Sequence, residues 1–379
     1  MTQNKKLKVL LVSPSPPPVG GIQSWSVAVL DYLISQDQVA FNYIDTVAKY
    51  RGYFEMGLYK RMIAGIRLTI DVVRAITNTI HESNPSVIHL TSSASLALFK
   101  DYLILRRARK FKIPVIIHWH FGRIPDLSTK KNWEWWLIYY LIKKSAYSIV
   151  IDDHSYKTLI EKGFKNVINI PNPISIELER KARNLQLYSS ERRAGRLVFV
   201  GHVERAKGVF ELVEACNSIS EVKELLIIGP YENDIRDELT NLSRRRENGI
   251  WLKFFGSLNN NEVLDHLESA SVMTLPSYTE GFPVAIIEAM AMACPVVATN
   301  VGAIPEMLNI NGDSPSGLCV PVKDRDALKA SIKKVLYNKE IAIKYGRNGL
   351  NRVMEKYTID KIFKEYKVVW QTAVENSKL

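Results

Sequence analysis

The sequence has few cysteines and no long apolar segment. The three cysteines, at positions 216, 294 and 319, are too widely spaced for a disulfide framework or a zinc cage, and such sparse use suits a reducing cytoplasm. The longest uninterrupted apolar run, Trp135–Ile142, has eight residues, whereas spanning a bilayer takes roughly 20. The run near the amino terminus, Val9–Val12, is too short for a signal peptide. We therefore expect neither a disulfide scaffold nor a transmembrane protein.

The composition is that of a folded protein with an uneven charge. The 379 residues are 46% apolar and 24% charged, which is the balance of a soluble globular chain of two or three domains rather than a disordered one. Residues 1–190 hold 26 Lys and Arg against 14 Asp and Glu, whereas residues 191–379 hold 25 of each, so the net charge of +12 lies in the first half. This excess indicates an anionic partner there, such as nucleic acid, a membrane surface or a phosphorylated substrate.

Short apolar runs alternate with longer amphipathic stretches along the whole chain. This rhythm predicts an α/β protein with parallel sheets and helices on both faces. A polar, arginine-rich stretch at 177–196 divides it into two similar halves and is the expected linker. The predicted strands cover residues 7–12, 87–90, 115–117, 148–151 and 167–170 in the first half and 197–200, 225–228, 251–255, 272–275, 296–298 and 318–320 in the second.

Residues 276–299 carry the most chemical information. Glu280 precedes a turn, and Glu288 lies eight positions later in an expected helix. The free N–H groups and the positive dipole end at a helix start favour an anion, and hydroxyls of a sugar and a ribose would satisfy the two carboxylates. The turn itself consists of Gly281, Phe282 and Pro283.

This segment resembles the signature of retaining nucleotide-sugar glycosyltransferases of family 4, in which the two glutamates match Glu280 and Glu288. Val301–Glu306 resembles a further element of the signature, and Cys294 stands where glycine is usual. The resemblance covers nearly the whole chain. It implies the GT-B fold, an α/β fold with two Rossmann-like parallel-sheet lobes facing each other across a cleft. The expected domains are an N-terminal acceptor-side lobe over 1–185, completed by a C-terminal helix at 358–379, and a nucleotide-sugar-binding lobe over 186–357.

Residues 200–208 resemble the basic loop of that family, in which an arginine and a lysine bind the leaving nucleoside diphosphate. Lys207 and Gly208 match directly, whereas His202 occupies the usual arginine position. Arg205 follows three residues later, and whether it replaces the missing arginine stays open. Preorganised cations stabilise the charge of a departing diphosphate without a metal, and the resemblance implies no metal and no other cofactor.

The first half contributes further matches. Gly20 and Gly21 resemble the glycine pair that lets backbone amides approach the donor. His120 matches the histidine that hydrogen-bonds the transferred sugar, and His118 lies on the same side of its strand, as a contact to the acceptor or a support for His120. A paired-histidine metal site lacks an evident third ligand. The remaining donor contacts implied by the resemblance are Asn172, in an Ile-Pro-Asn-Pro turn, and Ser277, at a strand end.

Residues 130–144 form an expected helix with lysines at both ends and five aromatic residues between them. Such a helix suits the headgroup zone of a membrane, and five basic residues within 106–112 add a second cluster. The alternative is that the aromatic residues pack in the core and the lysines are merely solvated. Nucleic acid is a weaker candidate partner, because the basic residues interleave with apolar helix faces and no nucleic-acid-binding module is recognisable.

Together, the residues and the resemblance predict a retaining glycosyltransferase in the cytoplasm, peripheral to the inner face of the membrane. It would move a sugar from a nucleotide-diphosphate sugar to a hydroxyl acceptor, such as a lipid-linked or cell-surface polysaccharide precursor of a capsule or exopolysaccharide. The alternative, which His202 favours, is a catalytically silent sugar-nucleotide-binding partner subunit of a transferase. The predicted catalytic residues are His120, Arg205, Lys207 and Glu280.

Overall fold

The computed structural model describes residues 6–17, 20–36, 39–47, 58–185, 192–244 and 251–377. The chain forms two compact units: unit 1 is Met1–Ile176 with Ile359–Leu379, and unit 2 is Glu177–Thr358. The division falls before the expected boundary at 185, because part of the expected linker is a helix, α7 (Ile176–Arg183), that is tied to unit 2. Lys181 of α7 forms ion pairs with Asp265 at 2.5 Å and Glu268 at 3.8 Å.

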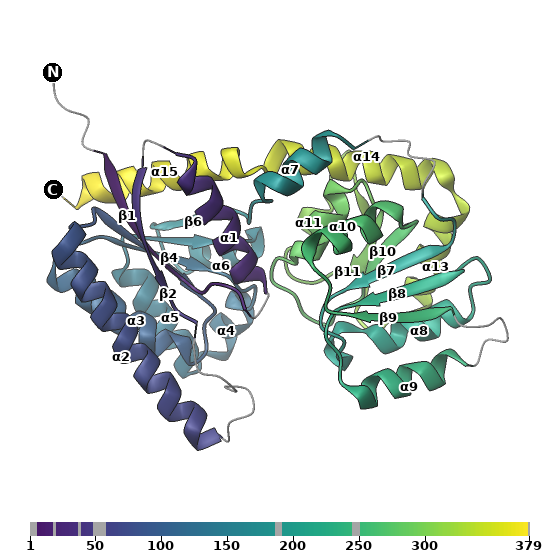
Figure 1. The fold of residues 1–379 in the computed structure, drawn as a ribbon, viewed down its shortest axis with the longest axis horizontal. Helices are drawn as coiled ribbons and strands as arrows, with labels where there is room; N and C mark the ends of the chain where they lie inside the picture. Colours follow the sequence, from purple (N-terminus) through teal and green to yellow (C-terminus); the bar gives the residue numbers. More distant parts are fainter. Residues whose placement is uncertain are drawn as a thin grey trace. The chain divides into compact units, whose positions relative to one another are not determined.

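The described part of unit 1 contains a six-stranded sheet in the order β2-β1-β3-β4-β5-β6, with every pair parallel (Figure 1). The side chains of its central strands β3 and β4 are all buried, because helices cover both faces of a parallel sheet. Leu10, Ile88 and Ile117, for example, are fully buried. The strands are β1 (Leu7–Ser13), β2 (Val39–Asp45), β3 (Val87–Ser92), β4 (Val115–Trp119), β5 (Tyr147–Val150) and β6 (Val167–Asn169).

The strand β2 has no counterpart among the strands predicted from the sequence. Among the described strands it pairs with β1 alone, in a register from Leu7↔Val39 to Ser13↔Asp45. Most of its side chains are only partly buried. An edge strand of this kind does not need a continuous apolar run, so it does not stand out in the sequence. All the strands that were predicted are confirmed within two residues of their expected ends.

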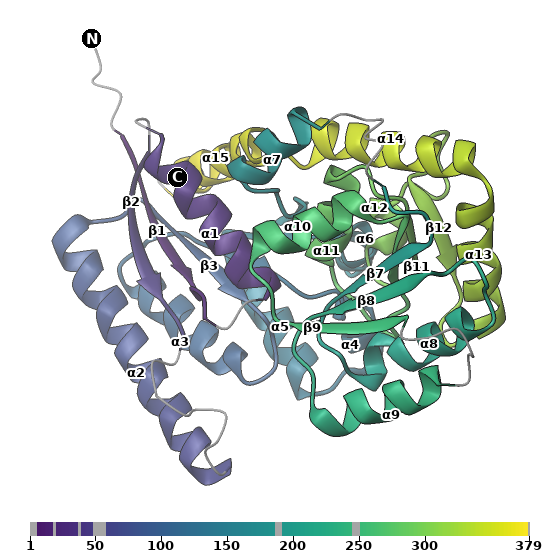
Figure 2. The same cartoon turned by 45° about the vertical axis from the view of Figure 1, so that its right-hand side comes forward.

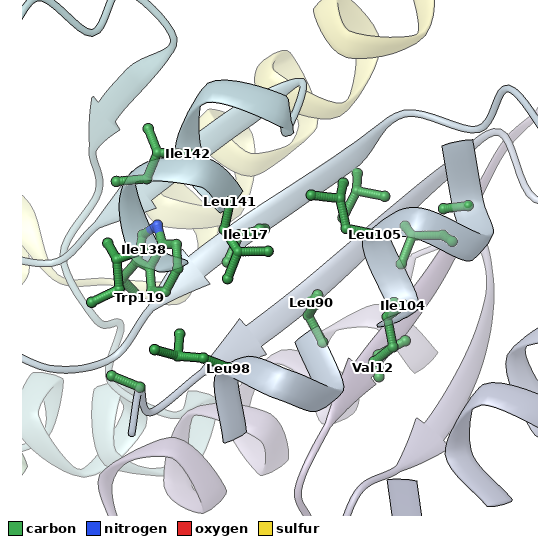
Figure 3. Packing of buried hydrophobic residues seen from close by; sticks show 14 of the residues in the cluster. Val12, Leu90, Leu98, Ile104, Leu105, Ile117, Trp119, Ile138, Leu141 and Ile142 are labelled. Atoms are coloured by element: carbon green, nitrogen blue, oxygen red, sulfur yellow. The ribbon is translucent and has the colours of Figure 1, made fainter. Parts of the chain in front are cut away.

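Helices cover both faces of the unit 1 sheet (Figures 1 and 2). On one face, Leu98 and Ile138 from two helices pack against Leu90 and Trp119 of the sheet in one buried cluster (Figure 3). On the other face, the N-terminal and C-terminal helices of the unit build a second cluster. The helices of the first face are α2 (Leu58–Ser83), α3 (Ala97–Lys110), α4 (Ile124–Lys130), α5 (Trp133–Lys144) and α6 (Asp153–Glu161), and those of the second are α1 (Gly21–Ile34) and α15 (Ile359–Asn376).

Unit 2 repeats this architecture with a different strand order. Its described residues form a six-stranded parallel sheet in the order β12-β11-β10-β7-β8-β9, with α10 and α11 on one face and α8 and α9 on the other (Figures 1 and 2). The strands are β7 (Arg196–Val200), β8 (Glu224–Ile228), β9 (Leu252–Gly256), β10 (Val272–Leu275), β11 (Val296–Thr299) and β12 (Gly317–Val320). The helices are α8 (Val209–Asn217), α9 (Asn233–Ser243), α10 (Asn260–Ser269), α11 (Val284–Ala291), α12 (Ile304–Met307), α13 (Arg325–Tyr337) and α14 (Lys339–Lys356).

The C-terminal helix α15 packs on unit 1. Its buried residues recur every three or four positions and so form one apolar face of the helix. The ring of Phe363 lies 4.8 Å from that of Tyr32 in α1, and the indole N–H of Trp25 donates to the hydroxyl of Tyr366 at 2.9 Å. Within the described ranges, no helix is both long enough and apolar enough to cross a membrane.

Ile362 lies on the apolar face of α15 and is fully buried. Replacing it by alanine should lower the free energy of unfolding by about 2–5 kcal/mol, because the change leaves a cavity in the core. Val368 lies on the same helix and is 60% exposed, so Val368→Ala should change stability by less than about 0.5 kcal/mol. Urea unfolding followed by circular dichroism measures both. Equal, small losses would contradict the docking of α15 on unit 1.

Candidate active site

The strand order of unit 2 defines where a ligand is expected. The chain runs outward from β7 to β8 and β9, and then returns to the other side of β7 to form β10, β11 and β12. The loops that follow β7 and β10 therefore diverge from adjacent strands at a topological switch point. In open α/β sheets, ligands bind at this point, beyond the carboxyl ends of the strands.

The loops after β7 and β10 are in direct backbone contact. The N–H of Tyr278 donates to the carbonyl of Ala206 at 2.8 Å. Gly208 has φ +68°, and a Cβ atom there would lie 2.1 Å from the carbonyl oxygen of Pro276. Only glycine fits both the left-handed conformation and this close approach. The position of Gly208 therefore fixes the preceding Lys207 against the β10 loop.

The loop after β11 holds the same segment from its other side. Gly302 has φ +54°, and a Cβ atom there would lie 2.2 Å from the carbonyl oxygen of Glu280. The N–H of Ala303 donates to the carbonyl of Gly281 at 2.9 Å, and the hydroxyl of Thr299 donates to the carbonyl of Ser277 at 2.5 Å. Residues 277–281 are thus fixed by backbone contacts on both sides.

Three predicted site residues meet in this framework. The ammonium group of Lys207 lies 2.8 Å from Oε1 of Glu280, and the hydroxyl of the buried Ser277 donates to the same oxygen at 2.7 Å. Both charged side chains are largely buried, with 23% and 11% exposure. The structure therefore brings Lys207, Ser277 and Glu280 together as one hydrogen-bonded cluster at the switch point.

Arg205 and His202 are not part of this cluster. The guanidinium group of Arg205 forms an ion pair with Glu238 of α9 and lies 4.1 Å from the centre of the Phe210 ring. Its side chain is 62% exposed, and the side chain of His202 is also exposed. Arg205 would have to leave Glu238 in order to join Lys207.

The helix α11 begins directly after the turn Gly281–Pro283. Pro283 is its N-cap residue and gives its first turn no side-chain cap, and the turn has no acidic residue. The backbone N–H groups at this helix start therefore favour an anion. Phe282 is buried and packs on Tyr357 at 5.8 Å between ring centres, which anchors the turn.

Glu288 lies in the second turn of α11. Burial raises the pKa of its carboxyl to about 7. A carboxylate accepts hydrogen bonds only, so a ligand that donates hydroxyl groups to Glu288 would lower this pKa and favour the ionised form.

In unit 1, the predicted residues Gly20 and Gly21 lie at the start of α1. Gly20 is the N-cap residue of this helix, and no side chain caps the first turn. A Cβ atom at Gly21 would meet nothing within 4 Å, and one at Gly20 would meet only the flexible end of Gln23. The fold of the chain therefore does not itself require either glycine.

The predicted histidines lie in a buried aromatic cluster at the end of β4. The rings of His118 and His120 are 4.0 Å apart, and Trp25 of α1 contacts both at 5.1 Å. A third histidine, His89 of β3, lies beside them with its Nε2 atom 3.2 Å from Nδ1 of His118. Burial lowers the pKa of His120 to about 3, so the histidines are neutral at pH 7.

His89 and its neighbour Trp370 are site residues that the sequence reasoning missed. The indole N–H of Trp370 donates to Nδ1 of His89 at 2.9 Å. Both ring nitrogens of His89 are therefore engaged, which removes it as the third ligand of a paired-histidine metal site. In the described part of the chain, no group of three or more His, Cys, Asp and Glu residues could hold a metal ion. The position of His89 inside the otherwise apolar strand 87–90 was the feature of the sequence that could have indicated its role.

Asn172 lies in the turn after β6. It is buried, and its Oδ1 atom has no hydrogen-bond partner in the ranges that the structure covers. Buried polar atoms almost always have a partner, so this oxygen is available to a ligand or a water molecule.

The fold and the two sites define a class of protein. Two Rossmann-like units, each with a parallel sheet, are the architecture of GT-B glycosyltransferases. Two family models match the chain: "Glycosyltransferase Family 4" over residues 43–178 and "Glycosyl transferases group 1" over residues 189–352. The chain belongs to the GT-B glycosyltransferases of the family 4 type.

The chain is similar to parts of several curated proteins. It is 32% identical over 142 residues to TuaC of Bacillus subtilis, named as a candidate teichuronic acid biosynthesis glycosyltransferase, with 36% of this chain and 34% of TuaC covered. It is 27% identical over 186 residues to the capsular polysaccharide biosynthesis glycosyltransferase CapM of Staphylococcus aureus, with 48% and 47% covered. The matches thus span between a third and a half of the length of these relatives.

Solved structures match the fold over nearly the whole chain. A sucrose-phosphate synthase from Thermosynechococcus elongatus has a TM-score of 0.75 at 17% identity, with 97% of this chain and 98% of that one covered. HepE from Anabaena, solved in complex with UDP, has a TM-score of 0.70 at 15% identity, with 97% and 100% covered.

Replacing Gly208 by alanine should destabilise unit 2 more than replacing Gly256, where φ is +66° and a Cβ atom would meet nothing within 4 Å. Both variants carry the left-handed strain, of about 1–2 kcal/mol, but only Gly208→Ala adds the clash with Pro276, of about 1–3 kcal/mol. Urea unfolding measures the difference. Equal losses would show that the Lys207 loop does not pack on the β10 loop as described.

Proposed function

We propose that the chain is a retaining glycosyltransferase that moves a sugar from a nucleotide-diphosphate sugar to a hydroxyl group of a glycan or lipid-linked acceptor. The single observation that carries the proposal is the cluster of Lys207, Ser277 and Glu280 at the switch point of unit 2. It supplies a cation for a leaving diphosphate and a carboxylate for sugar hydroxyls within one framework.

Lys207 and Glu280 can exchange partners when a donor binds. In the free protein the ammonium group is neutralised by the Glu280 carboxylate at 2.8 Å. A diphosphate brought to the start of α11 adds negative charge beside Lys207, so the lysine would turn to the phosphates and release Glu280 to the sugar hydroxyls. Because the two side chains are largely shielded from water, such charge interactions are stronger than at a surface.

The other predicted residues extend this assignment. Glu288 would accept hydrogen bonds from ribose hydroxyls, and the backbone at Gly20, Gly21 and Gly281 would approach the donor phosphates. His120 would hydrogen-bond the transferred sugar. Lys207 and backbone N–H groups would neutralise the leaving diphosphate, and the proposal assigns no metal and no cofactor to this step.

Relatives and structural neighbours support the classes of donor and acceptor. HepE was solved with UDP and with UDP-glucose, and TarM of S. aureus with UDP and a GlcNAc-glycerol compound. TuaC and CapM are named for the biosynthesis of teichuronic acid and capsular polysaccharide. A cell-surface polysaccharide precursor is therefore the acceptor class that we propose.

A silent sugar-nucleotide-binding partner subunit is the second candidate. The observation that favours it is the exposed His202 at the arginine position together with the engagement of Arg205 by Glu238, which leaves Lys207 as the cation in the cluster. The assay below separates the two candidates.

Replacing Lys207 by alanine should lower turnover by about 10²–10³-fold, because it removes the charge that stabilises the leaving group. Lys253→Ala is the matched control: Lys253 also pairs with a glutamate of unit 2, Glu224, at 2.7 Å, and turnover should stay within about twofold. The measurement is nucleoside diphosphate release from UDP-, GDP- and ADP-sugars with a lipid extract as acceptor, in the presence of EDTA. Turnover by Lys207→Ala within twofold of wild type would refute the assignment, and no release by the wild type would favour the silent partner.

We also propose that unit 1 docks on an anionic membrane through the exposed aromatic face of α3 and α5. The rings of Phe99 and Trp133 stack across these helices at 5.7 Å, and Trp136 is 60% exposed. Trp135, in contrast, is buried, so the alternative of packing in the core holds for that residue. The exposed large apolar side chains of this face are Leu96, Phe99, Leu103, Trp133, Trp136 and Tyr140.

The charges around the aromatic face of α3 and α5 favour an anionic lipid surface as its partner. Lysines flank α5 at both ends, and α3 ends in three exposed basic residues, Arg106, Arg109 and Lys110. Exposed aromatic rings between cations match the chemistry of an anionic headgroup layer over apolar chains. The inner face of the membrane would then be the place where the acceptor is met.

Replacing Lys130, Lys131, Lys143 and Lys144 by glutamate should weaken binding to phosphatidylglycerol vesicles at least about 100-fold at low salt, because each lysine contributes about 1 kcal/mol. The control replaces four exposed lysines of unit 2, Lys334, Lys339, Lys344 and Lys356, with the same change in net charge. Vesicle co-sedimentation at rising salt measures both variants, and wild-type binding should fall with salt. Similar losses in the two variants would contradict docking through α3 and α5.

A further inference from the structure

A chain of hydrogen bonds begins at the C-terminal helix and ends at the histidines of unit 1. The indole Nε1–H of Trp370 lies 2.9 Å from Nδ1 of His89. An indole nitrogen can only donate, so Nδ1 of His89 must accept. A neutral His89 consequently carries its single ring proton on Nε2.

The next link passes this constraint to His118. Nε2 of His89 lies 3.2 Å from Nδ1 of His118, so the proton on His89 makes it the donor and His118 the acceptor. A neutral His118 then also carries its proton on Nε2. Burial keeps both rings neutral. It lowers the pKa of His89 to about 3. It is also the main cause that lowers the pKa of His118, with smaller contributions from His120 and His89.

This series of hydrogen bonds ends beside three buried ring nitrogens that have no partner among the described residues. They are Nε2 of His118 and both ring nitrogens of His120. The two rings lie 4.0 Å apart between centres, and His118 is fully buried. Buried polar atoms are rarely left unpaired. A hydroxyl group, which both donates and accepts, would satisfy an N–H donor on one ring and an acceptor nitrogen on the other.

We propose that Trp370 and His89 are positioning residues that fix His118 as an N–H donor beside His120, so that the two rings bind a hydroxyl group of a ligand. That this hydroxyl belongs to a sugar rests on the proposed function. The tautomer of His118 follows from the two hydrogen bonds alone.

The first test is the tautomeric state of the wild-type protein. With ¹⁵N-labelled histidine, the ring-nitrogen resonances report which nitrogen carries the proton. At pH 7, His89 and His118 should both be protonated at Nε2 and unprotonated at Nδ1. A protonated Nδ1 on either ring would overturn the proposal, whatever the enzyme activity.

The second test breaks the first link. Trp370→Phe keeps an aromatic ring but removes the N–H donor, and should change the tautomer ratio of His89 by about 3- to 10-fold, the range that the net contribution of one hydrogen bond allows. Tyr366→Phe, one turn earlier on α15, removes the hydroxyl that accepts from Trp25 and should leave the ratio unchanged. An equal ratio in both variants would overturn the relay. If Trp370→Phe does not fold, the wild-type spectrum decides.

The third test connects the relay to catalysis. In the diphosphate-release assay, Trp370→Phe should lower kcat about 10-fold and leave KM for the nucleotide sugar within twofold. A shifted tautomer ratio with unchanged kcat would overturn the positioning role. If the wild type releases no diphosphate from any donor, the proposed function fails, and the two spectroscopic tests still decide the relay.

Discussion

The candidate donor site depends on the close packing of three loops at the carboxyl edge of the unit 2 sheet. A Cβ atom at Gly208 would overlap the carbonyl oxygen of Pro276, and one at Gly302 would overlap that of Glu280. These two backbone approaches determine where Lys207 and Glu280 lie, and their ion pair follows from that placement. The backbone geometry thus places the two charged side chains before any ligand binds.

Local sequence patterns predicted the strands of both units, and the family resemblance supplied the residues of the unit 2 cluster. Buried parallel strands are rich in apolar residues, so eleven strands were located. The edge strand β2 was missed because it is only partly buried. The motif from Glu280 to Glu288 lies in one segment and includes its own turn and helix start. The ion pair of Lys207 with Glu280 joins residues 73 positions apart, and no local pattern encodes such a contact.

The histidine cluster shows why long-range partners escape sequence reasoning. His120 was found through the family resemblance, and His118 because it lies two residues earlier on the same side of its strand. Trp370, in contrast, reaches His89 across 281 positions of the sequence. The contact exists because α15 returns to unit 1 and packs its apolar face on the sheet. The motif also did not predict the partner of Arg205. This partner is Glu238, which lies on a helix outside the motif.

The most direct test of the donor site is a crystal structure of the protein with a bound nucleoside diphosphate. We expect the phosphates to contact Nζ of Lys207 and the backbone N–H groups at the start of α11, with the nucleoside against Glu288. Lys207 and Glu280 should then have separated beyond their present 2.8 Å. A diphosphate bound away from the β7 and β10 loops, with this ion pair intact, would contradict the account.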